Sequence, residues 1–235
     1  LSFTAATCDT PQTVTVTGVD DNLIDGTQVS TITISVIDAI SDNNFDAVAD
    51  QTVSVSTTDD DVAGFTIEET NGSTAVDESG TTDLFTVVLD AQPTSNVVIT
   101  LTSNDGSEIS IPSSLTFTSA NWDTAQTVTV TGVDDSIIDG TITSTITVAV
   151  EDANSDNDFD AVANQTVSVD TTDDDLAGFT VDEFDGSTEV DESGPTDTFT
   201  IVLDAHPASD VILSPRPDGN GEATVTITRS LTPTT

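Results

Sequence analysis

The chain repeats itself every 114 residues. Residues 13–21 (TVTVTGVDD) recur unchanged at 127–135, and 45 of the first 61 residues are identical to those at 115–175. Repetition of this length and identity indicates tandem copies of one structural unit. The fold of a single copy therefore constrains the fold of nearly the whole chain.

Within the repeat, apolar and polar residues alternate over short runs. Residues 126–132 (QTVTVTG) place Val128 and Val130 on one face, and 84–89 (LFTVVL) is a nearly continuous apolar run, typical of a central buried strand. Gly, Asn, Asp, Ser and Pro gather between the runs, and no stretch has a helical period. We predict strands near 64–69, 83–89, 96–102, 108–111, 114–118, 126–132, 143–151 and 165–171.

Seven or eight strands in about 110 residues is the size of an immunoglobulin-like β-sandwich. We therefore expect an all-β chain of tandem immunoglobulin-like sandwiches with Greek-key-type antiparallel sheets. If a repeat runs from one Asp triplet to the next, residues 1–61 are the second half of a repeat, 62–175 a complete repeat, and 176–235 the first half of another. The expected aromatic core residues are Phe65, Phe85, Phe117, Trp122 and Phe159.

The charge of the chain is the second constraint. Asp and Glu number 43, against two Arg and no Lys, which gives a net charge of −41. This charge excludes nucleic acid and anionic membrane surfaces as electrostatic partners, and no apolar run is long enough to insert into a membrane. It also leaves nearly every carboxylate without a protein cation, so a compact fold needs cations from solution.

Catalytic groups are scarce. Cys8 and His206 each stand alone and Lys is absent, so the chain lacks the residues for nucleophilic or acid–base catalysis and for a zinc site. We expect that the protein is not an enzyme.

The acids gather in clusters at the ends of predicted strands. A strand opens after an Asp triplet, Asp77-Glu78 follows, then 133–135 (VDD) with Asp139 four residues later, and finally 172–175 (TDDD). In this order the motifs resemble the Calx-beta domain, a calcium-binding sandwich of sodium–calcium exchangers and of long bacterial surface proteins. The resemblance covers essentially the whole chain.

The resemblance implies Ca²⁺ at one end of the sandwich, near the junction with the next domain. It assigns Glu78 to the acid just after the first strand and leaves either Asp105 or Glu108 as the ligand from the loop before Leu115. The other implied ligands are Asp134, Asp135, Asp139, Asp173, Asp174 and Asp175. Their equivalents in the neighbouring copies, with that of Glu78, are Asp20, Asp21, Asp25, Asp59, Asp60, Asp61 and Glu192.

The chemistry supports calcium without the family. Ca²⁺ takes six to eight hard oxygen ligands, and two carboxylates ~5 Å apart repel by roughly 3 kcal/mol at an effective dielectric of 20. A merely solvated acidic surface predicts scattered acids rather than repeated clusters. The loop at 152–160 is a second candidate, since its alternating acids resemble the first half of an EF-hand loop; the alternative is a solvated turn fixed by Asx hydrogen bonds.

These features favour a calcium-rigidified repeat of a secreted or surface-anchored bacterial protein, such as an adhesin stalk or matrix fibre. The alternative is a filament or surface-layer subunit in which 176–235 of one chain completes 1–61 of the next by strand complementation. A Ca²⁺ sensor is a third hypothesis. The expected partners are neighbouring repeats or copies of the chain itself, with any cell-surface or matrix ligand bound through parts outside this sequence.

Overall fold

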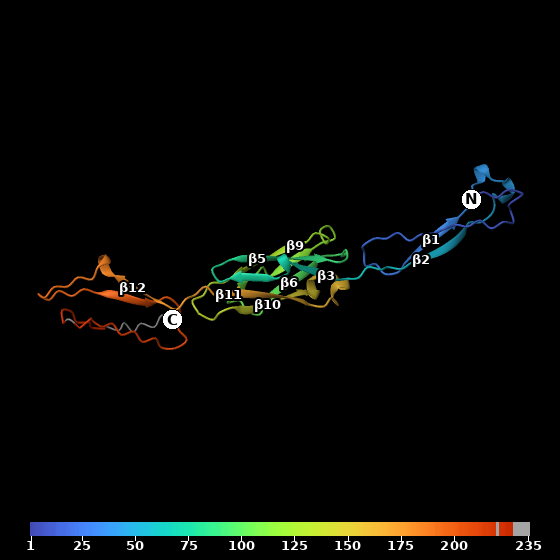
Figure 1. Ribbon diagram of the computed structural model, residues 1–235. Coiled ribbons are helices and arrows are strands. Elements are labelled where there is room, and N and C mark those ends of the chain that lie inside the picture. Colours follow the sequence, from blue (N-terminus) through green and yellow to red (C-terminus); the bar gives the residue numbers. More distant parts are fainter. Residues whose placement is uncertain (220, 228–235) are drawn as a thin grey trace.

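The structure is a computed structural model that describes residues 1–219 and 221–227. Figure 1 shows three β units in a row, which we call the amino-terminal unit (1–61), the central unit (62–175) and the carboxy-terminal unit (176–227). Helix is confined to single 3-10 turns: Asp38–Ile40, Asn43–Phe45, Thr70–Gly72, Asp152–Asn154, Asn157–Phe159 and Phe184–Gly186. Residues 228–235, which include Arg229, lie outside the described residues.

The central unit is a sandwich of two sheets. One sheet has the strand order β3-β5-β9-β7 and the other has the order β4-β11-β10-β6-β8. The strands are β3 (Phe65–Glu69), β4 (Thr74–Asp77), β5 (Thr82–Leu89), β6 (Val97–Ser103), β7 (Ile109–Ser110), β8 (Ser114–Phe117), β9 (Gln126–Gly132), β10 (Ile142–Val150) and β11 (Gln165–Thr172).

The all-β prediction is confirmed, and eight of these strands lie where the apolar alternation predicts them. β4 was missed. It has four residues, and only Thr74 and Val76 are buried, so its alternation is too short to stand out. The sheets are antiparallel, as expected, except at this strand, where β4 pairs in parallel with β11.

The core lies between the two sheets. Phe85, Phe117 and Phe159 are fully buried, Phe65 is nearly so, and the partly buried Trp122 packs against the same cluster. Val and Ile from alternating positions of β5, β6, β9, β10 and β11 fill the remaining space. This core therefore has the composition that the sequence predicts.

The flanking units hold fewer strands among their described residues. The amino-terminal unit has β1 (Gln28–Ile34) paired with β2 (Gln51–Thr57), and the carboxy-terminal unit has β12 (Phe179–Glu183) paired with β13 (Phe199–Leu203). Within the part of the chain that the structure describes, no helix is long and apolar enough to cross a membrane.

The two junctions between units are built alike. The backbone N–H of Gln92 in the central unit donates to the carbonyl of Asn22 at 2.8 Å, and the backbone N–H of His206 donates to the carbonyl of Ser136 at 2.6 Å. Because Asn22 and Ser136 are equivalent positions of the repeat, as are Gln92 and His206, each unit meets the next through the same pair of loops.

Candidate metal site

Parallel pairing of β4 with β11 places Glu78 at one end of the central unit. The register sets Asp77 opposite Thr172, and the backbone N–H of Glu78 donates to the carbonyl of Thr172 at 3.0 Å. Glu78 thereby lies beside Asp173, the first residue of the acidic triplet after β11. Glu78 follows the second strand of the unit, and not the first strand as the resemblance implies.

Glu108 reaches the same end from the other sheet. It precedes β7, whose Ile109 lies opposite Gly132 of β9, and its carbonyl accepts from the N–H of Val133 at 2.9 Å. The loop that leaves β9 carries Asp134, Asp135 and Asp139. Four segments of chain therefore converge here: the ends of β4, β9 and β11 and the start of β7.

Asp173 fixes the shape of this region. One of its carboxylate oxygens accepts from the backbone N–H groups of Asp139 (3.0 Å) and Gly140 (2.8 Å), and the other accepts from that of Asp175 (2.8 Å). Gly140 has a φ of +79°, a left-handed conformation in which glycine is favoured, and this conformation lets the loop turn its N–H groups toward Asp173. The hydrogen bonds from Gly140, Asp175 and Asp139 hold the pKa of Asp173 below its ordinary value, so it stays ionised.

Five carboxylates, including that of Glu78, converge at this end of the unit. Oxygens of Glu78, Asp173 and Asp175 all lie within 4.8 Å of one another, and so do oxygens of Glu78, Glu108 and Asp139. We call these residues the acid cluster: Glu78, Glu108, Asp139, Asp173 and Asp175. Both groups lie in the central unit. Within residues 1–219 and 221–227, no other group of three such side chains lies this close together.

The two glutamates of the acid cluster are buried without donors. Glu78 is 1% exposed and Glu108 is 4% exposed. The Oε2 atoms of both, and Oδ2 of Asp175, have no hydrogen-bond partner among the described residues. A buried polar atom in that condition costs free energy of about 1–3 kcal/mol, and more when it is charged.

The burial changes the acidity of these groups. Desolvation raises the pKa of Glu78 to about 7, and the negative charges of Asp135, Asp139, Asp173 and Glu108 add to the shift. Burial, followed by nearby carboxylates, also raises the pKa of Glu108 and that of Asp175. The folded chain therefore holds these acids in a place that disfavours their charged form.

The acid cluster fits a hard divalent cation. Two carboxylates at 4.8 Å repel by roughly 3 kcal/mol at an effective dielectric of 20, and several such pairs share this site. No Lys exists in the chain, and the two Arg residues stand at 216 and 229, far along the sequence. Because the donors are all carboxylates, with no His or Cys, they suit Ca²⁺ rather than zinc or copper.

The remaining predicted ligands lie outside the acid cluster. Asp135 is half-buried beside it and raises the pKa of Glu78, while Asp134 and Asp174 are exposed. Asp105 accepts from both the N–H and the hydroxyl of Ser107, which lowers its pKa. Of the two alternatives from the loop before Leu115, the structure thus brings Glu108 into the cluster and leaves Asp105 outside it.

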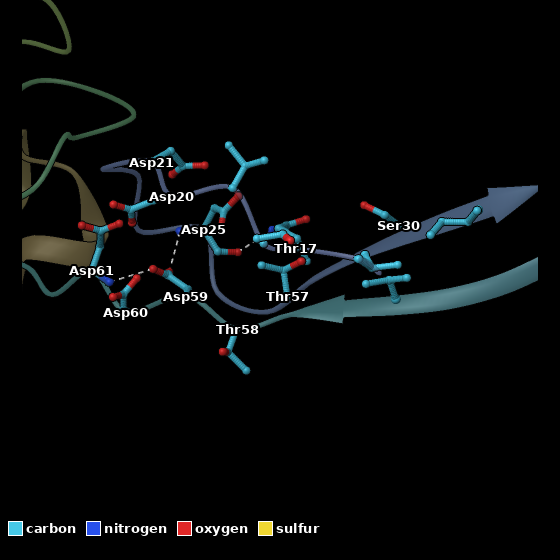
Figure 2. Close-up of a pocket in the computed structure, with 16 residues that line it drawn as sticks. Thr17, Asp20, Asp21, Asp25, Ser30, Thr57, Thr58, Asp59, Asp60 and Asp61 are labelled. Carbon is cyan, nitrogen blue, oxygen red and sulfur yellow. Dashed lines mark hydrogen bonds between the residues drawn. The ribbon is translucent and has the colours of Figure 1, made fainter. Parts of the chain in front are cut away.

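The amino-terminal unit repeats half of this arrangement. Asp59 accepts from the N–H groups of Asp25 (2.9 Å), Gly26 (2.7 Å) and Asp61 (2.9 Å), as Asp173 does in the central unit. Figure 2 shows six carboxylates gathered at the end of this unit: Asp20, Asp21, Asp25, Asp59, Asp60 and Asp61. They help to line a pocket of about 320 Å³. None of them is a counterpart of Glu78 or Glu108. The counterpart of Glu78 is Glu192, which is exposed in the carboxy-terminal unit.

The loop at 152–160 has a structural role. Oδ2 of the buried Asp156 accepts from the N–H (2.6 Å) and hydroxyl (2.8 Å) of Thr94 and from the N–H of Ser95 (2.8 Å), and Oδ1 accepts from the N–H of Asp158 (3.2 Å). Burial by itself raises the pKa of Asp156, but these hydrogen bonds outweigh it and hold the pKa below its ordinary value. The arrangement favours the turn fixed by Asx hydrogen bonds over the EF-hand-like interpretation.

Comparison with known proteins adds little. No protein-family model and no curated protein matches the chain. Solved structures that align with it include the apo-form Calx CBD1 domain (15% identity, TM-score 0.35, covering 47% of this chain and 98% of that one) and CBD12 from CALX1.2 (10%, 0.32, 59% and 69%). The E. coli chaperone DraB aligns at 7% identity and a TM-score of 0.35, over 50% of this chain and 59% of its own. Similarity at this level carries no argument about function.

Proposed function

We propose that the chain is a calcium-binding structural repeat, in which Ca²⁺ at the junctions between units orders the contact of one unit with the next. One observation carries this proposal: Glu78 and Glu108 are buried, lack donors and lie beside Asp173, Asp175 and Asp139, and no ion pair to them occurs among the described residues. A bound divalent cation reverses the sign of their mutual repulsion.

The residues of the site divide into two roles. Glu78, Glu108 and Asp175 offer buried oxygens with no other partner, so they are the strongest candidate ligands. Asp173 holds the loop at 139–140 and the triplet in place through its three backbone hydrogen bonds. Ca²⁺ would supply the positive charge that the sequence lacks.

The site is coupled to the junction through one loop. The segment between Asp135 and Asp139, which Asp173 anchors at its far end, contains Ser136 and Ile137, and both contact His206 of the next unit. The same holds for Asn22 and Leu23 against Gln92. Neutralising the carboxylates of this loop therefore stabilises the backbone that contacts the neighbouring unit.

The proposal places the protein outside the cell. Extracellular calcium modules bind with Kd values of about 10⁻⁴–10⁻³ M, whereas sensors bind at about 10⁻⁷–10⁻⁵ M. Near-identical tandem copies suit a spacer better than a switch, so we propose a non-catalytic stalk, matrix or fibre component of a secreted or surface-anchored protein. Neighbouring repeats are its immediate partners.

Thermal unfolding across a Ca²⁺ titration tests the proposal. Trp122 is the only Trp and packs against the core of the central unit, so its fluorescence reports that unit. At a Kd of 0.1–1 mM, 10 mM Ca²⁺ is expected to stabilise by about 1.4–2.7 kcal/mol over chelator, a rise in Tm of several degrees. Glu78→Gln is expected to lose most of this rise.

Glu68→Gln is the matched control, because Glu68 is an exposed acid of the same unit outside the acid cluster. It is expected to respond to Ca²⁺ as the wild type does. If NaCl at matched ionic strength raised Tm as much as Ca²⁺, the metal site would be refuted and the acids would be a salt-adapted surface. Equal responses of the two Gln variants would also contradict the assignment of Glu78.

A further inference from the structure

Five buried side-chain oxygens of the central unit have no hydrogen-bond partner among the described residues. Three belong to Glu78, Glu108 and Asp175 of the acid cluster, and the other two are the hydroxyl oxygens of Ser144 and Thr171. Both hydroxyl residues are completely buried. A hydroxyl can donate one hydrogen bond and accept two, so burying it without a partner costs free energy. A cation among the carboxylates accounts for the first three oxygens but leaves the two hydroxyls unexplained.

The strand register places both hydroxyls on the core face, at the end of the sandwich where the acids converge. Ser144 is the first buried residue of β10, and Thr171 is the last buried residue of β11. Val169 lies opposite Ser144 in this antiparallel pair, so Ser144 and Thr171 are diagonal neighbours. The Cβ atoms of diagonal neighbours are roughly 7 Å apart, a spacing that two side chains can bridge through one water molecule.

Thr171 lies next to the buried Glu78. The parallel register sets Asp77 opposite Thr172, so Glu78 and Thr171 are diagonal neighbours on the core face of β4 and β11. No direct hydrogen bond joins them, because Oε2 of Glu78 and the hydroxyl of Thr171 are both without a partner among the described residues. A third group between them would satisfy both.

Ser144 lies beside the loop that carries Glu108. This loop leaves β6 at Asn104, whose backbone N–H donates to the carbonyl of Thr145 at 3.0 Å. The side-chain oxygen of Asn104 accepts from the N–H of Thr145 at 2.7 Å, which fixes the start of the loop next to Ser144. Oε2 of Glu108 and the hydroxyl of Ser144 are again both buried without a partner in the described part of the chain.

The amino-terminal unit has the same hydroxyls beside its own acids. Ser30 and Thr57 occupy the positions of Ser144 and Thr171 in this unit. Both line the pocket of about 320 Å³ that the acids also line (Figure 2). Hydroxyls and carboxylates therefore border one space in this copy of the repeat as well.

We propose that Ser144 and Thr171 together hold a buried water molecule that serves as a further oxygen ligand of the cation in the acid cluster. The inference rests on the proposed function, since it concerns the same metal site. A buried water typically makes about three hydrogen bonds to polar groups that have no other partner, and the two hydroxyls and the glutamate oxygens offer them. Ca²⁺ takes six to eight oxygen ligands and accepts water among them.

The spacing of the chain favours a water over direct binding of the hydroxyls. Asp173 and Thr171 are two residues apart on one face, which separates them by roughly 6.6 Å along the strand. Oxygen ligands of Ca²⁺ lie about 2.3–2.6 Å from the ion. An ion held by Asp173 and its neighbours is therefore beyond the reach of the Thr171 hydroxyl, and one water spans the remaining distance.

Two variants of Thr171 test the hydroxyl through the Tm that Trp122 reports across a Ca²⁺ titration of the full chain. Thr171→Val keeps the shape of the side chain and removes the hydroxyl. Loss of a residue that orients a metal ligand typically weakens metal binding about 10–100-fold, so the Ca²⁺ concentration needed for a given rise in Tm is expected to increase by that factor. Thr171→Ser keeps the hydroxyl and is expected to retain the wild-type Ca²⁺ dependence. Thr166→Val, on the exposed face of the same strand, is the control and is expected to titrate like the wild type.

A double variant tests whether the two hydroxyls share one water. Ser144→Ala is expected to weaken Ca²⁺ binding as Thr171→Val does. The double variant is expected to lose no more affinity than either single variant, because the water is already lost in each. Losses that add would show two independent contributions and contradict the shared water.

A crystal structure of the Ca²⁺-bound chain checks the water directly. One water is expected within about 3.2 Å of both hydroxyl oxygens and in contact with the ion. Direct contact of the ion with either hydroxyl, or hydroxyls that contact neither water nor ion, would overturn the proposal.

Measurements in chelator separate this inference from packing effects and from the proposed function. There, Thr171→Val is expected to unfold at the wild-type Tm or above it, because it leaves no buried hydroxyl without a partner. A fall in Tm of equal size in chelator and in Ca²⁺ would assign Thr171 a packing role and overturn the proposal. If Thr171→Val and Ser144→Ala responded to Ca²⁺ like the wild type while Glu78→Gln did not, the water would be refuted and the metal site would stand. A wild type with no Ca²⁺-specific response would refute both.

Discussion

The charge of the site depends most on the protonation state of Glu78. Its raised pKa of about 7, against an ordinary 4.5, means that the folded chain binds a proton that the unfolded chain releases between these values. In chelator, the stability that this group contributes is therefore fully present below pH ~4.5 and is lost as the pH rises through 7, by roughly 3 kcal/mol if it titrates alone.

This sign predicts an unusual pH profile. We expect the Tm reported by Trp122 in chelator to rise as the pH is lowered from 8 to 5.5, and Glu78→Gln to flatten that rise. With saturating Ca²⁺ the wild-type profile is expected to reverse, because the cation favours the ionised carboxylate and competes with the proton. A chelator profile that is already flat in the wild type would contradict the raised pKa.

The sequence predicts the acids of the site as a group, but it does not show which of them are buried and which face solvent. Asp173, Asp174 and Asp175 are indistinguishable in the sequence, yet the strand end turns the middle one to solvent and the outer two inward. The choice between Asp105 and Glu108 likewise depended on the short pairing of Ile109 with Gly132. Burial of a carboxylate is a property of packing, and local pattern does not report it.

At the scale of elements, the contact of β9 with β4 is the most constrained. Gly132→Ala places a methyl 2.1 Å from the carbonyl oxygen of Asp77, so backbone must shift. We expect a loss of about 1–3 kcal/mol in the free energy of unfolding, together with weaker Ca²⁺ binding because Glu78 follows Asp77. Denaturant unfolding, monitored through the fluorescence of Trp122, measures the loss of stability. Gly106→Ala, which meets no atom within 4 Å, is the control, and equal midpoints for the two variants would refute the constraint.

The turn built around Asp156 gives a second prediction at this scale. Asp156→Ala leaves the N–H groups of Thr94 and Ser95 without their acceptor, so we expect a loss of about 2–3 kcal/mol. The loss is expected to be equal in chelator and in Ca²⁺, since this carboxylate caps a turn. Asp42→Ala is the matched control, because Asp42 is exposed and its carboxylate accepts hydrogen bonds from Asn44 alone. A loss that appeared only in Ca²⁺ would restore the metal-loop interpretation.

The strands that could be predicted are those with a long alternation of apolar and polar residues. β5, β9 and β10 each carry enough alternating residues to be recognised, whereas β4 has one apolar residue that is buried, Val76. A parallel partner distant in sequence leaves no local signal, because the pairing depends on the crossing of the chain from one sheet to the other. The strand that positions Glu78 is therefore the one that could not be predicted from the sequence.

For the whole molecule, the net charge of −41 opposes any fixed arrangement of units. The backbone contacts at the junctions, Gln92 with Asn22 and His206 with Ser136, lie beside acidic loops. Without a cation, repulsion within these loops acts directly on the segments that make the contacts. If Ca²⁺ binds as proposed, it removes this repulsion and stabilises the contacts between units.

Small-angle scattering at dilute concentration tests this coupling. In Ca²⁺ we expect a narrow range of maximum dimensions, as for a defined rod, and in chelator a broader one, because the units pivot about 59–64 and 173–178. Glu78→Gln is expected to leave the second junction pivoting even in Ca²⁺, whereas Glu68→Gln is expected to scatter like the wild type. Identical profiles in chelator and in Ca²⁺ would show that the junctions are ordered without metal, and the role of Ca²⁺ would then be confined to the stability of each unit.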